Sequence, residues 1–105
     1  MKINDIYTAY VSWPGGGKRR PVLIIEDGKE KVTVFKITTK YEQKSDRIKK
    51  NYFPISNWKE SGLDKQSYID TNRKKNLPKD KVTFKKVGRL SEKDLSKFNE
   101  FTKNR

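Results

Sequence analysis

One run of four apolar residues, Val22-Leu23-Ile24-Ile25, constrains the fold of this chain more than any other feature. Three of the four residues are β-branched, and no other apolar run in the sequence is unbroken over this length. Such a run is typical of a β-strand that is buried on both faces. We therefore predict that residues 22–25 lie at the centre of a sheet.

Flexible and charged residues come directly before this run. Residues 13–17 read Trp-Pro-Gly-Gly-Gly, a loop whose glycines allow sharp bends and a close approach of the backbone to a ligand. Three cations follow the loop, namely Lys18, Arg19 and Arg20. A flexible basic edge is thus expected beside the most buried strand.

The charge of the chain indicates a polyanionic partner. Its 105 residues predict a single domain, residues 1–105, with 26 Lys and Arg against 13 Asp and Glu and a net charge of +13. The excess is evenly spread, with 12 cations and 6 acids in residues 1–50 and 14 and 7 in the rest. Such a surface attracts nucleic acid. The alternative is that lysine serves only to keep a small protein in solution.

The apolar content predicts a subunit interface. Hydrophobic residues make up 31% of the chain, which gives a lone domain a thin core. A homodimer would compensate by burying further apolar surface. We expect Tyr7, Tyr10, Trp13 and Phe53 to be exposed and available for this interface.

Missing residue types and segments exclude several function classes. The chain has no Cys and no His, so thiol nucleophiles, zinc–thiolate sites and histidine proton shuttles are excluded. No metal site and no cofactor are predicted. The first residues lack an apolar signal core, and no apolar segment approaches the roughly 20 residues that span a bilayer. We expect a cytoplasmic protein without membrane contact.

Residue patterns predict further strands around the central one. Residues 5–13 and 31–39 are rich in β-branched and aromatic residues, and Asp27-Gly28 is a favoured hairpin turn. Shorter strands are expected at residues 51–55 and 67–71. Residues 41–50 are predicted to be an exposed loop, because they are polar and their apolar residues follow neither the helical nor the strand periodicity.

The last part of the chain is basic and ends in a helix. Residues 73–75 and 79–86 carry seven cations against one acid, and residues 57–62 predict one helical turn capped by Asn57. Ser91 and Asp94 form a capping box that opens a terminal helix. Leu95, Phe98 and Phe101 form the apolar stripe that packs this helix on the sheet.

Four short motifs follow one another along the chain in an order that can be compared with known families. They are Arg-Pro-Val-Leu-Ile-Ile at 20–25 after the glycine loop, Ile37-Thr38 at a strand end, Leu77-Pro78, and Gly-Arg-Leu-Ser at 88–91. Over essentially the whole chain, they resemble the PemK/MazF family of bacterial toxins. The resemblance implies a mainly β, α+β fold, namely an SH3-like small barrel with a C-terminal α-helix. It also implies a homodimer that acts as a metal-independent endoribonuclease on single-stranded RNA, such as mRNA, and a cognate antitoxin as partner.

The resemblance assigns the catalytic roles to Arg20 and Thr38. The reaction needs the RNA 2′-hydroxyl to attack the adjacent phosphorus, so the protein must orient that group and stabilise the charge on the phosphorane. Arg20 matches the arginine of the family's Arg-Pro-Val motif, and its planar fork can grip two phosphate oxygens. Thr38 matches the strand-end threonine, whose hydroxyl can donate to a phosphate oxygen or orient the attacking hydroxyl.

Further residues are predicted to bind the substrate. Trp13 can stack on an unpaired base, or it can be a core or interface residue. The other predicted contacts are Lys18, Arg19, Thr39, Lys40, Asp70, Asn72 and Lys75. In the strand after Ser67, many family members have an arginine, an acid and an arginine-threonine pair, which this chain lacks. We interpret this strand as the one that governs which bases are accepted, with Asp70 as a further candidate for the general base.

Two other functions are compatible with these residues. One is a non-catalytic nucleic-acid-binding barrel of the SH3 type. The other is a CcdB-like poison of a DNA topoisomerase, which depends on a C-terminal tryptophan-glycine motif. The present chain ends Phe-Thr-Lys-Asn-Arg, which counts against the second alternative.

Overall fold

The computed structural model describes residues 1–104, and the side chains of residues 11–13 lie outside this description. The apolar run at 22–25 forms part of an interior strand, as predicted. Along the chain the elements are β1 (Asp5–Trp13), β2 (Gly16–Asp27), β3 (Lys31–Thr38), α1 (Asp46–Lys49), β4 (Tyr52–Pro54), β5 (Tyr68–Pro78), β6 (Phe84–Arg89) and α2 (Glu92–Lys103).

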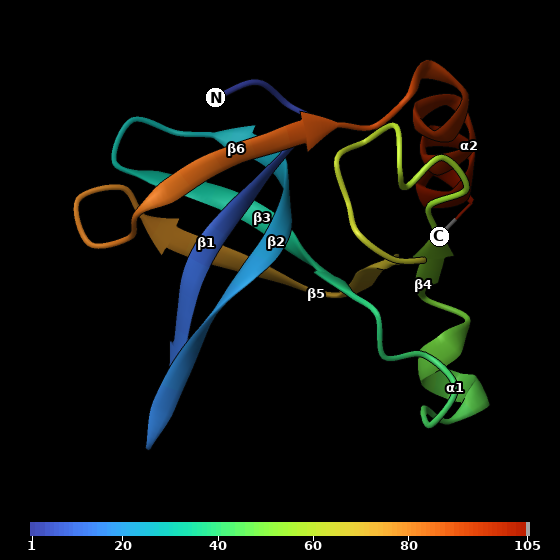
Figure 1. The fold of residues 1–105 in the computed structure, drawn as a ribbon, viewed down its shortest axis with the longest axis horizontal. Helices are drawn as coiled ribbons and strands as arrows, with labels where there is room; N and C mark the ends of the chain where they lie inside the picture. The colour runs from blue at the N-terminus through green and yellow to red at the C-terminus, as the bar shows by residue number, and fades with distance from the viewer. Residues whose placement is uncertain (105) are drawn as a thin grey trace.

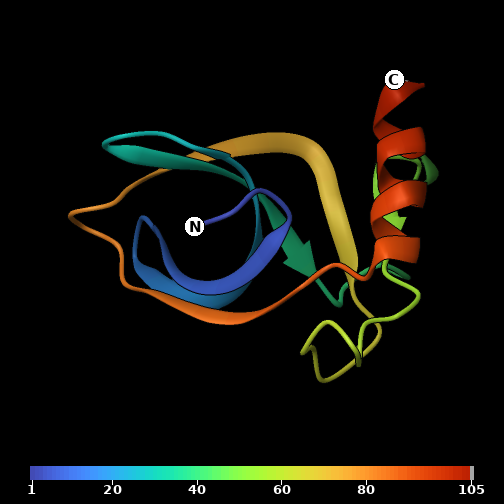
Figure 2. The ribbon, with the colours of Figure 1, turned by 90° about the horizontal axis from the view of Figure 1, so that it is seen from above.

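All six strands form one antiparallel sheet in the order β4-β5-β3-β2-β1-β6. The sheet curls strongly, so that β1, β2 and β6 lie across from β3 and β5 (Figure 2). Within residues 1–104 no pairing joins β4 to β6, and the barrel therefore stays open. The predicted mainly β fold with a C-terminal helix is confirmed, with an open sheet instead of a closed one.

The sheet buries a different apolar cluster on each face. One face, here called the helix-side face, packs against α2, and the other is called the second face. The helix-side cluster contains Ile6, Leu23, Phe35, Ile37, Phe53, Ile55, Ile69, Leu90 and Phe98. The second-face cluster contains Ala9, Val22, Ile24, Val32, Val34 and Leu77. Because successive residues of β2 and β3 enter opposite clusters, both strands read as nearly continuous apolar runs.

Helix α2 begins at the predicted cap, Ser91, but Asp94 bonds to another loop instead of closing the predicted capping box. The Ser91 hydroxyl accepts a hydrogen bond from the backbone N–H of Asp94 (3.1 Å). The buried Asp94 carboxylate accepts two more, from the backbone N–H groups of Ser56 (3.1 Å) and Asn57 (2.7 Å). These bonds tie α2 to the loop before β5, beside β4 (Figure 1).

Strand β5 is longer than predicted. The sequence favoured a short strand at 67–71, whereas β5 continues through polar and basic residues to Pro78. Those residues are extended because β3 supplies a partner: Val34 lies opposite Lys75, and Thr33 opposite Asn76. Strand β6 likewise forms in the basic stretch by pairing with β1.

One other local prediction was wrong, and another was confirmed. The predicted loop at 41–50 contains helix α1, which begins after Ser45, whose hydroxyl accepts from the Ile48 N–H (3.4 Å). The predicted helical turn at 57–62 is present, because the Ser61 N–H donates to the Asn57 carbonyl (3.1 Å), and it ends at Gly62, which has a φ of +90°. The predicted cap is not made, since the Asn57 side chain donates to the Ser91 hydroxyl instead (2.9 Å).

A bulge interrupts the β3–β5 pairing. Phe35 lies opposite Lys74, while the next residue, Lys36, lies opposite Asp70. Residues 71–73 therefore have no partner in β3, and we call them the β5 bulge. Thr71 is held from the other side, because its N–H and its hydroxyl both donate to the Asn51 carbonyl (2.9 and 2.6 Å).

The aromatic residues predicted for a subunit interface differ in exposure. Tyr10 is 49% exposed, whereas Tyr7 is half-buried against the edge of Phe84. The prediction was wrong for Phe53, which is 5% exposed because it packs among the aromatic rings of α2. The side chain of Trp13 lies outside the described residues.

The predicted glycine loop at 13–17 was too long: only residues 14 and 15 form the turn at the tip of the β1–β2 hairpin, because Trp13 pairs with Gly16 and Ser12 with Gly17. Gly15 has a φ of +87°, a conformation that favours glycine. Gly17 lies directly under the ring of Tyr10, so that a side chain there would collide with it. Neither helix of residues 1–104 is long and apolar enough to cross a membrane.

Candidate functional site

Arg20 and Thr38 lie on the same face of the sheet. Side chains alternate along a strand, so Arg20 faces the same way as Val22, and Thr38 the same way as Lys36. Val22 and Lys36 are directly opposite each other in the β2–β3 pair, which puts all four residues on the second face. If this register is continued by two residues, Arg20 lies across from Thr38.

Three of the other predicted RNA contacts share this face. Lys18 alternates with Arg20 along β2. Asp70 and Lys75 in β5 lie opposite Lys36 and Val34, respectively. The second face therefore brings together side chains from three strands that are distant in sequence.

Beside these residues the second face contains a cavity of about 480 Å³, here called the basic cavity. Val22 and Val34 contribute apolar surface to it, and Tyr52 lines one side. Its charged lining residues are Lys36, Lys44, Arg73, Lys75 and Asp70. With four cations and one carboxylate, the cavity favours an anionic ligand such as a nucleic-acid backbone.

The Asp70 carboxylate has partners on both oxygens. Its Oδ1 accepts hydrogen bonds from the backbone N–H and the side-chain Nδ2 of Asn72 (2.9 Å each). Its Oδ2 lies 3.8 Å from the Lys36 Nζ. Asp70 thus fixes the start of the β5 bulge and draws Lys36 to the wall of the basic cavity.

Tyr52 faces the same carboxylate from β4, directly opposite Asp70. Burial, followed by the neighbouring Asp70 charge, raises the pKa of the Tyr52 hydroxyl. The phenol therefore stays protonated near neutral pH and can donate a hydrogen bond within the cavity.

Thr38 presents a nearly buried hydroxyl at the end of β3. The side chain is 7% exposed, and its Oγ1 accepts a hydrogen bond from the Lys40 backbone N–H (3.1 Å). This bond fixes the oxygen and leaves its proton available to a phosphate oxygen. Lys40 contributes through its backbone here, while its side chain is exposed.

Of the remaining predicted contacts, Arg19 and Thr39 lie elsewhere, whereas Asn72 lies at the basic cavity. Arg19 alternates with Arg20 and so faces the other side, where its Nη1 donates to the Thr83 carbonyl (3.2 Å). Thr39 lines a separate cavity of about 310 Å³, with Thr8 and Pro21. Trp13 has its side chain outside the described residues. Asn72 lies in the β5 bulge and lines the basic cavity.

Sequence reasoning missed several residues of the basic cavity. Lys36 carried a usable signal, because it is the one cation inside an otherwise β-forming stretch. Lys44 and Arg73 lie in segments interpreted only as basic, and Tyr52 joins Asp70 only through the β4–β5 pairing. Within residues 1–104, no three His, Cys, Asp or Glu side chains are grouped closely enough to hold a metal ion.

Comparison with known proteins identifies the class. The family described as PemK-like, MazF-like toxin of type II toxin-antitoxin system matches residues 2–101, and the chain belongs to it. Among solved structures, the fold is similar to the Mycobacterium tuberculosis toxin MazF-mt6, with a TM-score of 0.66, 20% identity and 92% of each chain covered. No curated protein sequence matches the chain.

Proposed function

We propose that this toxin is a metal-independent endoribonuclease that cuts single-stranded RNA, such as mRNA, at short sequence motifs in the cytoplasm. The observation that carries this proposal is the common face of Arg20 and Thr38, beside a cavity with four cations. The family supports the same activity, since endoribonuclease activity is general among its members.

The proposed reaction is an internal transfer at one phosphodiester. The RNA 2′-hydroxyl attacks the adjacent phosphorus and loses its proton, and the bond from phosphorus to the 5′-oxygen breaks as that oxygen gains a proton. The products are a 2′,3′-cyclic phosphate and a 5′-hydroxyl. Arg20 stabilises the charge on the phosphorane through its guanidinium, and Thr38 donates its hydroxyl proton to a phosphate oxygen.

The basic cavity is proposed to hold the RNA next to the scissile bond. Lys18, Lys36 and Lys75 neutralise phosphates on the second face, which supplies affinity without regard to sequence. Asp70 and Asn72 can read donor and acceptor groups on base edges. Because both Asp70 oxygens already have partners, we assign Asp70 to positioning and base selection instead of proton transfer.

Two partners complete the proposal. A cognate antitoxin is implied by the type II family, and we propose that it blocks the basic cavity. We also propose a homodimer, because Tyr10 remains exposed and the apolar content is low. Sedimentation at micromolar concentration tests the dimer, and a clean monomer would contradict it.

The decisive test is RNA cleavage in the presence of a metal chelator. A long unstructured RNA should be cut, with cyclic phosphate and 5′-hydroxyl ends, and Arg20→Ala should lower the rate of cutting by roughly 10²–10³-fold while the protein stays folded. Arg47→Ala, an exposed arginine on α1, serves as the matched control. RNA that is bound but stays intact would favour the non-catalytic barrel. Cutting at the wild-type rate in Arg20→Ala would overturn the assignment of the site.

A further inference from the structure

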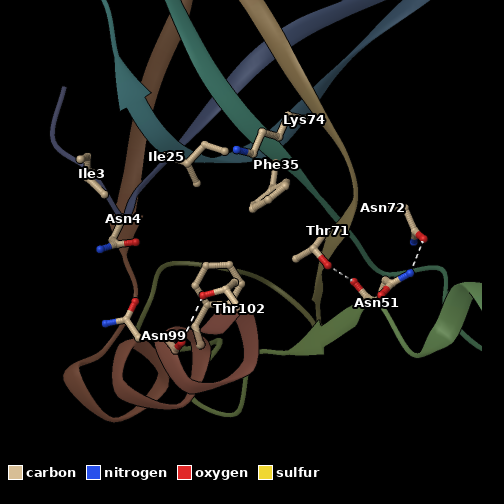
Figure 3. Close-up of a pocket in the computed structure, with 11 residues that line it drawn as sticks. Ile3, Asn4, Ile25, Phe35, Asn51, Thr71, Asn72, Lys74, Asn99 and Thr102 are labelled. Carbon is tan, nitrogen blue, oxygen red and sulfur yellow. Dashed lines mark hydrogen bonds between the residues drawn. The ribbon is translucent and has the colours of Figure 1, made fainter. Parts of the chain in front are cut away.

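A second cavity lies on the other side of β5, against α2. Its volume is about 530 Å³, within the range of small-molecule sites. The N-terminal segment, β2, β3, β5 and α2 all contribute to its wall (Figure 3). Four asparagines line it, namely Asn4, Asn51, Asn72 and Asn99, and we therefore call it the amide cavity.

Two of these amides are available to a ligand. Asn51 and Asn72 bond to each other (2.9 Å), whereas no hydrogen bond of the Asn4 or Asn99 side chain is found within residues 1–104. Both line the cavity, Asn4 from the N-terminal segment and Asn99 from α2 (Figure 3). Each carries a donor and an acceptor, so together they can pair with a ligand that has both on one edge.

The rest of the lining is apolar, with one charge. Phe35 and Phe98 meet edge to face (centroids 6.3 Å apart) and both line the cavity, and because they are 8% and 4% exposed, only a small part of each ring reaches this aromatic wall. Lys74, opposite Phe35 in the β3–β5 pair, is the only charged residue among the described residues of this lining. The described lining therefore combines an aromatic wall, the two available amides of Asn4 and Asn99, and one cation. It contains no carboxylate that would repel an anion.

We propose that the amide cavity binds a nucleotide. The planar base lies along the Phe35 and Phe98 wall, its polar edge pairs with the Asn4 and Asn99 amides, and its phosphate meets the Lys74 ammonium. Amide side chains are suited to base edges, and bases pack well on aromatic surfaces. The nucleotide is either free in solution or part of an RNA strand, since both carry the same groups. The site does not depend on endoribonuclease activity.

The β5 bulge connects this site to the basic cavity. Thr71 lines the amide cavity, Arg73 lines the basic cavity, and Asn72 lines both. Asn72 also holds the Asp70 Oδ1 through two hydrogen bonds. A nucleotide in the amide cavity therefore contacts the segment that positions Asp70 on the second face.

The test is a nuclear magnetic resonance titration of the full chain labelled with ¹⁵N. Each of the four ribonucleoside 5′-monophosphates is added separately, and so is a short RNA that is 2′-O-methylated throughout and cannot be cut. The side-chain amide signals of Asn4 and Asn99 should shift. Shifts with monophosphates identify a free nucleotide as the ligand, and shifts with RNA alone identify a nucleotide of a strand.

Variants locate the bound nucleotide. Asn99→Trp should fill the cavity and weaken binding about tenfold, and Asn99→Ala gives the same test if the larger side chain disturbs folding. Lys74→Gln should weaken binding, whereas Lys93→Gln, an exposed lysine of α2 outside the cavity, should not. Arg20→Ala should strongly slow the proposed cleavage and leave these shifts unchanged. The proposal is overturned if no nucleotide or RNA moves the Asn4 and Asn99 signals, or if binding is unchanged in Asn99→Trp and Asn99→Ala.

Discussion

The two sides of β5 carry different chemistry within one small domain. On the second face, the basic cavity sets four cations around the Asp70 carboxylate. On the helix-side face, the amide cavity has four asparagines and a single cation, Lys74. Charges gathered on the second face favour affinity for any polyanion, whereas amides beside an aromatic wall favour a particular shape and hydrogen-bond pattern. In our proposals, the second face captures an RNA strand, with Asp70 and Asn72 selecting bases, and the amide cavity binds a single nucleotide.

The sharpest test of this comparison uses neighbouring arginines on opposite faces. Arg20→Ala should lower the rate of RNA cleavage by roughly 10²–10³-fold, because one charge-stabilising donor is removed from the reaction centre. Arg19→Ala removes a contact with the Thr83 carbonyl on the other side and should change the rate much less. Single-turnover kinetics on one RNA measures both rates. Equal losses in the two variants would mean that the faces are not distinct in function.

A smaller effect is expected for the two threonines at the end of β3. Thr38→Val removes the hydroxyl but keeps the shape, and the cleavage rate should fall about tenfold to hundredfold through loss of a hydrogen bond to a charged group. Thr39→Val changes the cavity of Thr8 and Pro21 and should have little effect. If Thr39→Val is the more damaging change, the RNA lies on the helix-side face.

The salt dependence of RNA binding tests whether individual lysines of the second face contact phosphates. Lys36→Gln and Lys75→Gln should each reduce the slope of log affinity against log salt by about 0.7, the value for one phosphate contact on a single strand. Fluorescence anisotropy with a non-cleavable RNA measures this slope. Lys93→Gln is the control, and an equal change in that variant would indicate attraction by net charge alone.

The smallest effect concerns Tyr52 and alkaline pH. The raised pKa means that the unfolded chain loses the phenol proton first, so folding stability is full below about pH 10 and falls as pH rises further. Tyr52→Phe should therefore lose less unfolding free energy than the wild type between about pH 9 and about pH 11. Urea denaturation measures this loss, with Tyr10→Phe as the control at an exposed tyrosine. Parallel pH curves for Tyr52→Phe and the wild type would contradict the expected role of Tyr52.

Much of the fold could be read from local patterns. The apolar run at 22–25 identified the interior strand β2, and the Ser91 capping box located α2, because both signals lie within a few residues of the chain. Strands β5 and β6 were misjudged because their polar residues are extended only by pairing with β3 and β1. Helix α1 was missed because four residues are too few to show periodicity.

Part of the candidate site could be predicted from the sequence, because its residues also lie in local motifs. Arg20 and Thr38 lie in recognisable motifs, and the alternation of side chains sets them on one face once the β2–β3 register is known. The position of Asp70 opposite Lys36 depends on the β5 bulge. No residue pattern in that strand predicts where its pairing with β3 is interrupted. Tyr52 lies opposite Asp70 only because β4 pairs with β5.

The β5 bulge gives such a toxin a short segment whose amino-acid sequence can vary. Residues 71–73 have no partner in β3, so exchanging them leaves the pairing of Phe35 with Lys74 and of Lys36 with Asp70 in register. The helix-side cluster contains none of these three residues, and Arg20 and Thr38 lie in other strands. Under the proposed function, the preference for particular RNA sequences can then change at this one short segment while the rest of the domain keeps its architecture.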